Sequence, residues 1–124
     1  MQTLQQERAK HALKEVKALK DEKKEDGNKL TARASELPFM IHVNGLGQAA
    51  AFFKSKGDKD GYGRIYGLLS GWLTQPGRPF AGKADLMEAI TQSDLNIYRM
   101  AQTEAMQYMD WVKKFANAYL KSEK

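Results

Sequence analysis

Residues 93–120 read SDLNIYRMAQTEAMQYMDWVKKFANAYL, and the predicted fold is built around this stretch. Apolar side chains recur in it at intervals of three and four, which is the period of one face of an α-helix. They are Tyr98, Ala101, Ala105, Tyr108, Val112, Phe115 and Tyr119, with Met106, Met109 and Leu120 beside them. Ser93 is the predicted N-cap, and Asp94 suits the positive end of the helix dipole. A helix of about 28 residues is about 42 Å long, so we expect it to be the spine of a helical bundle.

The N-terminal segment predicts a second amphipathic helix, over residues 4 to 25. Thr3-x-x-Gln6 matches the capping-box pattern, and apolar residues follow at Ala9, Leu13, Val16 and Leu19. The segment ends in the charged run DEKKEDGN, where Gly27 is the expected C-terminal stop. Its many lysines form a basic outer face, for which solvated surface is the first interpretation and nucleic-acid contact the second.

Residues 28–53 predict two helices separated by a break. Asn28 is a plausible cap for a helix with Leu30, Ala34 and Leu37 on its apolar face. Because Pro38 lacks a backbone N–H and restricts Leu37, this helix is expected to kink or restart there. Asn44-Gly45 permits a tight turn, and the small residues Gly47 and Ala49 to Ala51 let the following helix pack closely.

Residues 62–73 have helical spacing and three regularly placed glycines. Ile65, Tyr66, Leu69, Trp72 and Leu73 form the apolar face, whereas Gly63, Gly67 and Gly71 fall four residues apart on another face. Each glycine costs a helix roughly 1 kcal/mol relative to alanine. The glycines therefore indicate close approach of another backbone, either from a helix of the same chain or across a subunit interface.

The rest of the chain contains a loop and a short helix. TQPGRPFAGK (residues 74–83) is rich in turn-forming residues, and a short helix is expected around residues 85–91. No segment repeats, and none alternates with period two. The sequence therefore predicts an all-α fold in which residues 1–124 form a compact single-domain helical bundle with a long C-terminal helix.

Composition limits the function classes. The chain has 124 residues, 42% of them hydrophobic and 28% charged, which is ordinary for one globular domain. It contains no cysteine, which excludes disulfides, thiolate catalysis and cysteine-ligated zinc. The formal net charge of +5 favours an anionic partner such as nucleic acid. Because the N-terminus lacks an apolar signal-peptide core and no apolar run could span a bilayer, a cytoplasmic protein is expected.

A dinucleotide site is the first chemistry to weigh, because PFMIHVNGLGQAAAFF (residues 38–53) contains Gly45-x-Gly47-x-x-Ala50 after an apolar run. A Rossmann unit also needs a second strand that ends in an acidic residue about twenty positions on. The chain has helical spacing there instead. We therefore expect the apolar residues before Gly45 to be helical and the chain to bind no nucleotide.

Other catalytic or metal patterns fail for similar reasons, and no cofactor is expected. In the calcium-like run from Asp58 to Gly63, Tyr62 stands where an oxygen ligand belongs. His11 and His42 lack the spacing of a zinc pair, and Ser70 does not sit in a G-x-S-x-G elbow. Four acids on the C-terminal segments could pair in space without any sign in the sequence that they do: Glu88, Asp94, Glu104 and Asp110.

Several segments together resemble the small helical subunit of the Cmr complex, the type III-B CRISPR effector that targets RNA. The resemblance covers nearly the whole chain, and its motifs are specific in their order and spacing rather than singly. They are LQQER (residues 4–8), LPFMIHVNGLGQAAAFFKSK (37–56), IYGLLSGWL (65–73) and EAMQYMDWVKKFANAYL (104–120).

The resemblance implies a non-catalytic subunit in antiviral defence. Copies of such a subunit stack as a minor filament beside the other Cmr subunits, and the guide–target RNA duplex lies between, held by its backbone. The resemblance places candidate RNA-binding residues at Arg8, Lys56, Lys113 and Lys114, and with less support at Lys54, one turn from its match. For each, solvated surface or an ion pair is the alternative. Arg99 is expected to be structural, paired with Glu104. The competing function is a purely protein–protein scaffold, and an enzyme has the least support.

Overall fold

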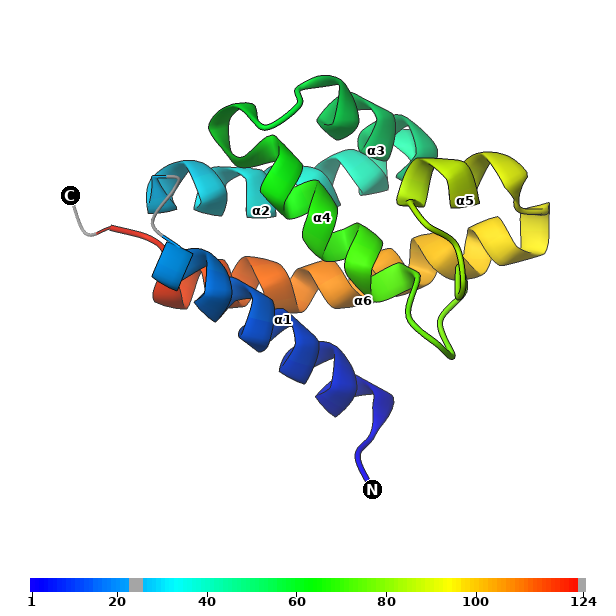
Figure 1. The fold of residues 1–124 in the computed structure, drawn as a ribbon, viewed down its shortest axis with the longest axis horizontal. Helices are drawn as coiled ribbons and strands as arrows, with labels where there is room; N and C mark the ends of the chain where they lie inside the picture. Colours follow the sequence, from blue (N-terminus) through cyan, green and yellow to red (C-terminus); the bar gives the residue numbers. More distant parts are fainter. Residues whose placement is uncertain (23–25, 123–124) are drawn as a thin grey trace.

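The computed structural model describes residues 1–22 and 26–122, and these residues form helices joined by turns and one longer loop (Figure 1). The elements are α1 (Leu4–Glu22), α2 (Gly27–Asn44), α3 (Leu46–Ser55), a 3₁₀ turn η1 (Lys59–Gly61), α4 (Tyr62–Leu73), α5 (Leu86–Gln92) and α6 (Leu95–Tyr119). The all-α prediction is confirmed.

Helix α6 is the spine that the sequence predicted. It packs against α1, α2 and α4, and it buries Ala101, Ala105, Tyr108, Val112 and Ala116 completely. The helix is 25 residues long rather than about 28, because it begins at Leu95. Its N-cap is Asp94, whose side chain accepts a hydrogen bond from the Ile97 amide at 2.9 Å. The prediction that Ser93 is the N-cap was wrong, because Ser93 is the C-cap of α5.

The N-terminal cap was predicted correctly, and the junction between α1 and α2 was not. Thr3 and Gln6 exchange both hydrogen bonds of a capping box, at 2.9 and 3.1 Å. The N-cap of α2 is Asp26 rather than Asn28, because the Asp26 carboxylate accepts from the Asn28 amide at 2.8 Å. Gly27 is the first residue of α2, not a stop for α1, and its missing side chain leaves room for the Leu120 carbonyl at the end of α6. Residues 23–25 of the predicted first helix lie outside the described residues.

Helix α2 runs through Pro38 as one helix, so of the predicted kink or restart the restart does not occur. A proline removes one hydrogen bond and crowds the preceding turn, but here Ala34, Leu37 and Ile41 are buried on both sides of it. The apolar residues before Gly45 are therefore helical, as predicted. Gly45 separates α2 from α3 with φ of 88°, a conformation that favours glycine.

The amides that follow Gly45 are occupied by α6. The Leu46 amide donates to the side-chain oxygen of Gln102 at 2.9 Å, and the Gly47 amide donates to the Tyr98 hydroxyl at 2.8 Å. In a dinucleotide-binding turn, such amides face a pyrophosphate. Here they attach the start of α3 to the spine.

The glycines of α4 do not bring a second helix of the chain into contact. At Gly67 and Gly71 an added Cβ would meet nothing within 4 Å, and both residues are exposed. Of these three glycines only Gly63 is crowded. A Cβ added there would meet the Asp58 side chain and would lie 2.9 Å from the Gly57 carbonyl oxygen. The intramolecular interpretation was therefore wrong for Gly67 and Gly71.

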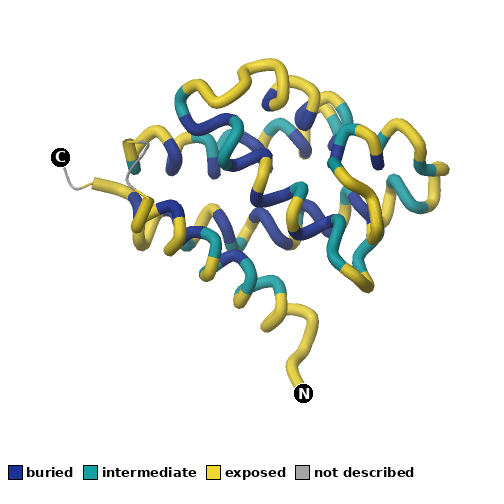
Figure 2. Tube along the Cα trace, viewed as in Figure 1, coloured by how far each residue is buried: buried dark blue, intermediate teal, exposed yellow. Residues whose placement is uncertain are grey.

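One core cluster joins the six helices of the described residues, and buried positions follow the inner faces of the tube in Figure 2. The predicted loop at residues 74–83 is confirmed. It is anchored by Phe80, whose side chain is buried and whose amide donates to the Leu73 carbonyl at 3.0 Å. Tyr66 adds a second tie, because its hydroxyl donates to the Asp85 carboxylate at 2.9 Å. The loop is therefore held against the bundle at both ends.

The glycine contacts predict opposite effects of the same substitution. Gly63→Ala should lower the melting temperature, because the backbone at Gly57 must shift, at a cost of about 1 kcal/mol or more. Gly67→Ala should raise the melting temperature slightly, since alanine is favoured in a helix by about 0.5–1 kcal/mol and has space here. Thermal denaturation followed by circular dichroism measures both. A loss of stability in Gly67→Ala would contradict the open environment of that residue.

Candidate functional site

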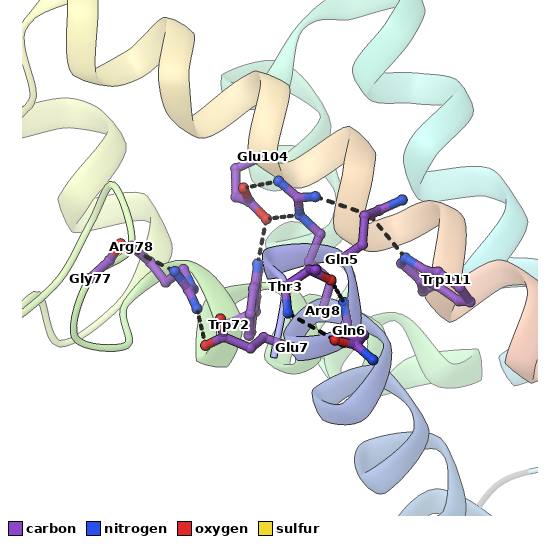
Figure 3. A network of polar contacts seen from close by, with 10 residues as sticks. All are labelled: Thr3, Gln5, Gln6, Glu7, Arg8, Trp72, Gly77, Arg78, Glu104 and Trp111. Atoms are coloured by element: carbon purple, nitrogen blue, oxygen red, sulfur yellow. Dashed lines mark hydrogen bonds and ion pairs between the residues drawn. The ribbon is translucent and has the colours of Figure 1, made fainter. Parts of the chain in front are cut away.

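A buried polar cluster joins α1, α4 and α6 (Figure 3). The Arg8 guanidinium donates to both carboxylate oxygens of Glu104, at 2.6 Å from Nε and 2.8 Å from the second nitrogen. The indole Nε1 of Trp72 donates to the same carboxylate at 2.9 Å. The Arg8 and Glu104 side chains are only 12% and 10% exposed. This geometry is a bidentate, charge-assisted pair, the strong class of protein hydrogen bond.

The cluster determines the protonation of both charged groups. The hydrogen bond to Glu104 raises the pKa of Arg8 above its usual value. Burial raises the pKa of the Glu104 carboxyl, but the hydrogen bonds from Arg8 and Trp72 outweigh it and lower that pKa overall. Glu104 is therefore ionised in the folded chain.

An aromatic layer continues the cluster. Trp72 and Tyr108 stack with ring centroids 5.2 Å apart and planes 8° from parallel. The Nδ1 atom of His11 lies 2.6 Å from the Tyr108 hydroxyl. Burial lowers the pKa of His11, and burial raises the pKa of Tyr108 well above its usual value. His11 therefore belongs to the packed interior between α1 and α6, where its ring forms a hydrogen bond with the Tyr108 hydroxyl.

Arg78 attaches the loop of residues 74–83 to this aromatic layer. Its guanidinium lies 4.4 Å from the centroid of the Trp72 ring and pairs with Glu7 of α1 at 3.1 Å. This cation–π contact on a buried indole, together with the ion pair, fixes the loop beside α1 (Figure 3). Sequence reasoning missed Arg78, because it lies in a stretch where only turn-forming residues stand out.

Arg8 therefore differs from the other candidate RNA-binding residues. For Arg8 the structure shows the ion-pair alternative, with a partner 96 positions away in the sequence. The expected pair between Arg99 and Glu104 was wrong, because Arg8 occupies the carboxylate. Arg99 is exposed on α6.

Lys54 and Lys56 lie at the end of α3, beside aromatic rings. The Lys54 ammonium is 5.0 Å from the centroid of the Tyr66 ring, and the Lys56 ammonium is 5.0 Å from that of Phe52. Both residues are exposed. A cation–π contact uses one face of an ammonium group and leaves its remaining protons to solvent or an anion.

Lys113 and Lys114 lie side by side on the outer face of α6, between the buried residues Val112 and Ala116. Lys114 pairs with Asp110 at 2.9 Å, with both side chains more than 60% exposed. An exposed pair one helical turn apart contributes about 0.3–0.5 kcal/mol and opens easily. Lys113 has no side-chain partner among residues 1–22 and 26–122.

The four exposed lysines form two separate groups. Helix α3 meets α6 at its N-terminus, through Leu46 and Gly47, whereas Lys54 and Lys56 lie at its other end. Lys113 and Lys114 belong to the C-terminal half of α6, which packs on α1 and α2. In Figure 1, α3 lies at the top of the molecule, and α6 runs below α2.

Several of the residues weighed for catalysis have partners elsewhere in the fold. Asp60 pairs with Lys29 at 3.1 Å, the Ser70 hydroxyl accepts from the Leu86 amide at 3.2 Å, and Asp94 caps α6. Glu88 and His42 are exposed. In the described part of the chain, no group of three or more histidines or acids is arranged to hold a metal ion.

Comparison with known proteins establishes the family. A family model described as "CRISPR-associated protein (Cas_Cmr5)" matches residues 4–119, which is nearly the whole chain. The chain belongs to this Cmr5 family. The solved structure of a CRISPR-associated Cmr5 family protein from Thermus thermophilus has the same fold, with a TM-score of 0.79 at 26% sequence identity. The match covers 97% of this chain and 100% of the other.

Membership confirms the resemblance found in the sequence: the chain is a small subunit of the type III-B Cmr system, and other Cmr subunits are its partners. In this member of the family, the buried cluster lies where α1 and α4 meet the spine helix α6, and the exposed lysines are not part of it. None of the helices within residues 1–22 and 26–122 has the length and apolar character needed to cross a membrane.

The cluster predicts a pH-dependent stability. Because the folded pKa of Glu104 is lowered, its stabilisation is fully present above the ordinary glutamate pKa of about 4.3 and is lost as pH falls through the lowered value. Glu104→Gln at pH 7 leaves Arg8 buried without its counter-charge and should cost about 3 kcal/mol. The gap between wild type and variant should shrink at about pH 3, below the ordinary glutamate pKa.

Thermal denaturation at both pH values measures this effect. Asp110→Asn on the same helix is the matched control, because its ion pair is exposed and should change the melting temperature little. Equal melting temperatures of wild type and Glu104→Gln at pH 7 would refute the role of the cluster.

Proposed function

We propose that this Cmr5 family chain is a non-catalytic subunit that holds the guide–target RNA of the Cmr effector by its backbone phosphates. In this proposal, copies of the chain stack as a minor filament along the complex. The observation that carries it is the exposed lysine pair Lys113–Lys114 on the spine helix. Lys54 and Lys56, at the C-terminal end of α3, are candidates for a second phosphate contact.

The lysine pair suits phosphate rather than base recognition. Two ammonium groups on successive residues of a rigid helix are point charges without the planar fork that reads base edges. Phosphate contacts position a nucleic acid and carry no sequence information. A subunit that accepts any guide sequence needs this kind of contact. Arg8 is not included, since its guanidinium is buried against Glu104.

The non-catalytic assignment is supported by the use of the polar residues. Glu104, the most buried of the acids weighed for catalysis, forms three hydrogen bonds with Arg8 and Trp72. Asp94 caps a helix, and Asp110 pairs with Lys114. A general acid or base needs a proton-transfer partner in a cleft, and these groups have structural partners instead.

Self-stacking is supported by the glycine face of α4. A groove of about 300 Å³ between α1 and α4 is lined by Gly63 and Gly67, together with Ala18 and Leu19. Gly67 and Gly71 expose backbone that no part of the described chain approaches. Glycine permits close approach of a second backbone, so this face is the subunit-interface candidate.

The scaffold alternative has the same fold and partners but no RNA contact. In that case the charge of the lysines serves solubility, and their replacement leaves RNA affinity unchanged. Counterion release separates the two functions, because only phosphate contacts give a salt-dependent affinity.

The proposal predicts the effect of replacing both lysines by alanine. Lys113→Ala with Lys114→Ala should leave the fold intact, because both side chains are exposed. Target RNA binding by the assembled Cmr complex should weaken equally for all sequences. The slope of log K against log salt should shrink by ~1.4 if the target behaves as a single strand, or by ~1.8 if it is duplex-like.

Lys10→Ala with Lys14→Ala is the matched control, since it removes the same charge from the exposed side of α1. It should leave the slope unchanged. An unchanged slope in the Lys113 and Lys114 variant, measured by filter binding over a salt series, would favour the scaffold function.

A further inference from the structure

A small apolar groove lies beside Lys113, between α2 and α6. Its volume is about 300 Å³. Its walls are Ser35, Pro38, Phe39 and His42 from α2, and Met106, Asp110 and Lys113 from α6. We call it the Phe39 groove. None of its lining residues belongs to the buried cluster of Arg8, Trp72 and Glu104.

Phe39 is exposed, whereas Leu37 and Ile41, two positions to either side of it on α2, are buried. Its side chain is 66% exposed, whereas Leu37 and Ile41 are each 1% exposed and form the core face of the helix. Phe39 therefore contributes little to the core. An aromatic ring this exposed offers a face for stacking.

The charges around the groove favour an anionic occupant. The groove walls carry one acid, Asp110, and two lysines stand against it: Lys113 in the wall itself and Lys114, 2.9 Å from the Asp110 carboxylate. Lys113 and His42 have no side-chain partner in the described ranges and are both exposed. An aromatic ring next to an unpaired ammonium group is the combination that binds single-stranded nucleic acid, by base stacking and phosphate contact.

We infer that the Phe39 groove binds one unpaired nucleotide of RNA, with the base stacked on the Phe39 ring and the adjacent phosphate on the Lys113 ammonium. The inference rests on the proposed function, because it uses Lys113 as a phosphate ligand. It goes further by adding a base contact that a duplex cannot make, since paired bases are already stacked. Stacking tolerates every base, so the site is compatible with any guide.

The test compares two ligands of equal charge: a short oligouridylate, and an abasic ribose–phosphate oligomer of the same length. Fluorescence titration of the full chain at low salt gives both affinities. Wild type should bind the oligouridylate about fivefold tighter or more, which is the lower end of the effect of one base–aromatic stack. Phe39→Leu should abolish this preference without changing the salt slope, whereas Phe39→Tyr should keep it.

Lys113→Ala separates this inference from the proposed function. Its salt slope should fall by ~0.7 on the single strand for one lost phosphate contact. If that slope falls and Phe39→Leu still prefers the oligouridylate, the groove inference is wrong while phosphate binding stands. If neither variant differs from wild type, or if wild type binds neither ligand, then the groove inference and phosphate binding by Lys113 are both wrong for the isolated chain. Loss of a Cmr subunit from Phe39→Leu complexes with unchanged oligouridylate affinity would assign the groove to a protein, and the inference would be overturned.

Discussion

The carboxylate of Glu104 joins three helices that share no backbone hydrogen bonds. It accepts from Arg8 of α1 and from Trp72 of α4 while belonging to α6, the helix on which both of them pack. A buried ion pair adds little net stability relative to an apolar replacement, but a misplaced helix would leave a buried charge without its partner. The pair therefore penalises any other register of α1 on the spine. The stack of Trp72 on Tyr108 and the Arg78 contact both depend on that register.

This arrangement divides the basic residues between two roles. Arg8 and Arg78 stabilise the fold, because their side chains are largely buried and paired with Glu104 and Glu7. Lys113 and Lys114 are exposed on the same helix that carries Glu104, so the rigidity of the spine fixes their spacing. In the proposed function, the interior cluster fixes the position of α6, and the exposed lysines of α6 contact the RNA. A net charge of +5 alone would not distinguish these roles.

The helices were predictable because their signal is local. The apolar stripe from Tyr98 onward repeats with the helical period, and the structure buries most of it. The Arg8–Glu104 pair was not predictable in this way, since spacing within a helix says nothing about a partner 96 positions away. Arg99, on the same helix as Glu104, was the natural local choice and was wrong. At Pro38 the predicted restart does not occur, and the buried residues Leu37 and Ile41 lie on one helix on either side of it. The glycines of α4 indicated close approach without saying to what, and the chain itself leaves Gly67 and Gly71 open.

In the proposed division of roles, the exposed lysines of α6 contact RNA, whereas the buried basic residues hold the fold. Lysine footprinting of the assembled Cmr complex, with and without target RNA, is the sharpest test of this division. Acylation with an amine-reactive reagent, read by mass spectrometry, reports the accessibility of each lysine. Addition of target RNA should protect Lys113 and Lys114 and leave Lys10 and Lys14 of α1 as reactive as before. Equal reactivity of Lys113 and Lys114 in the two states would contradict an RNA contact at the spine helix.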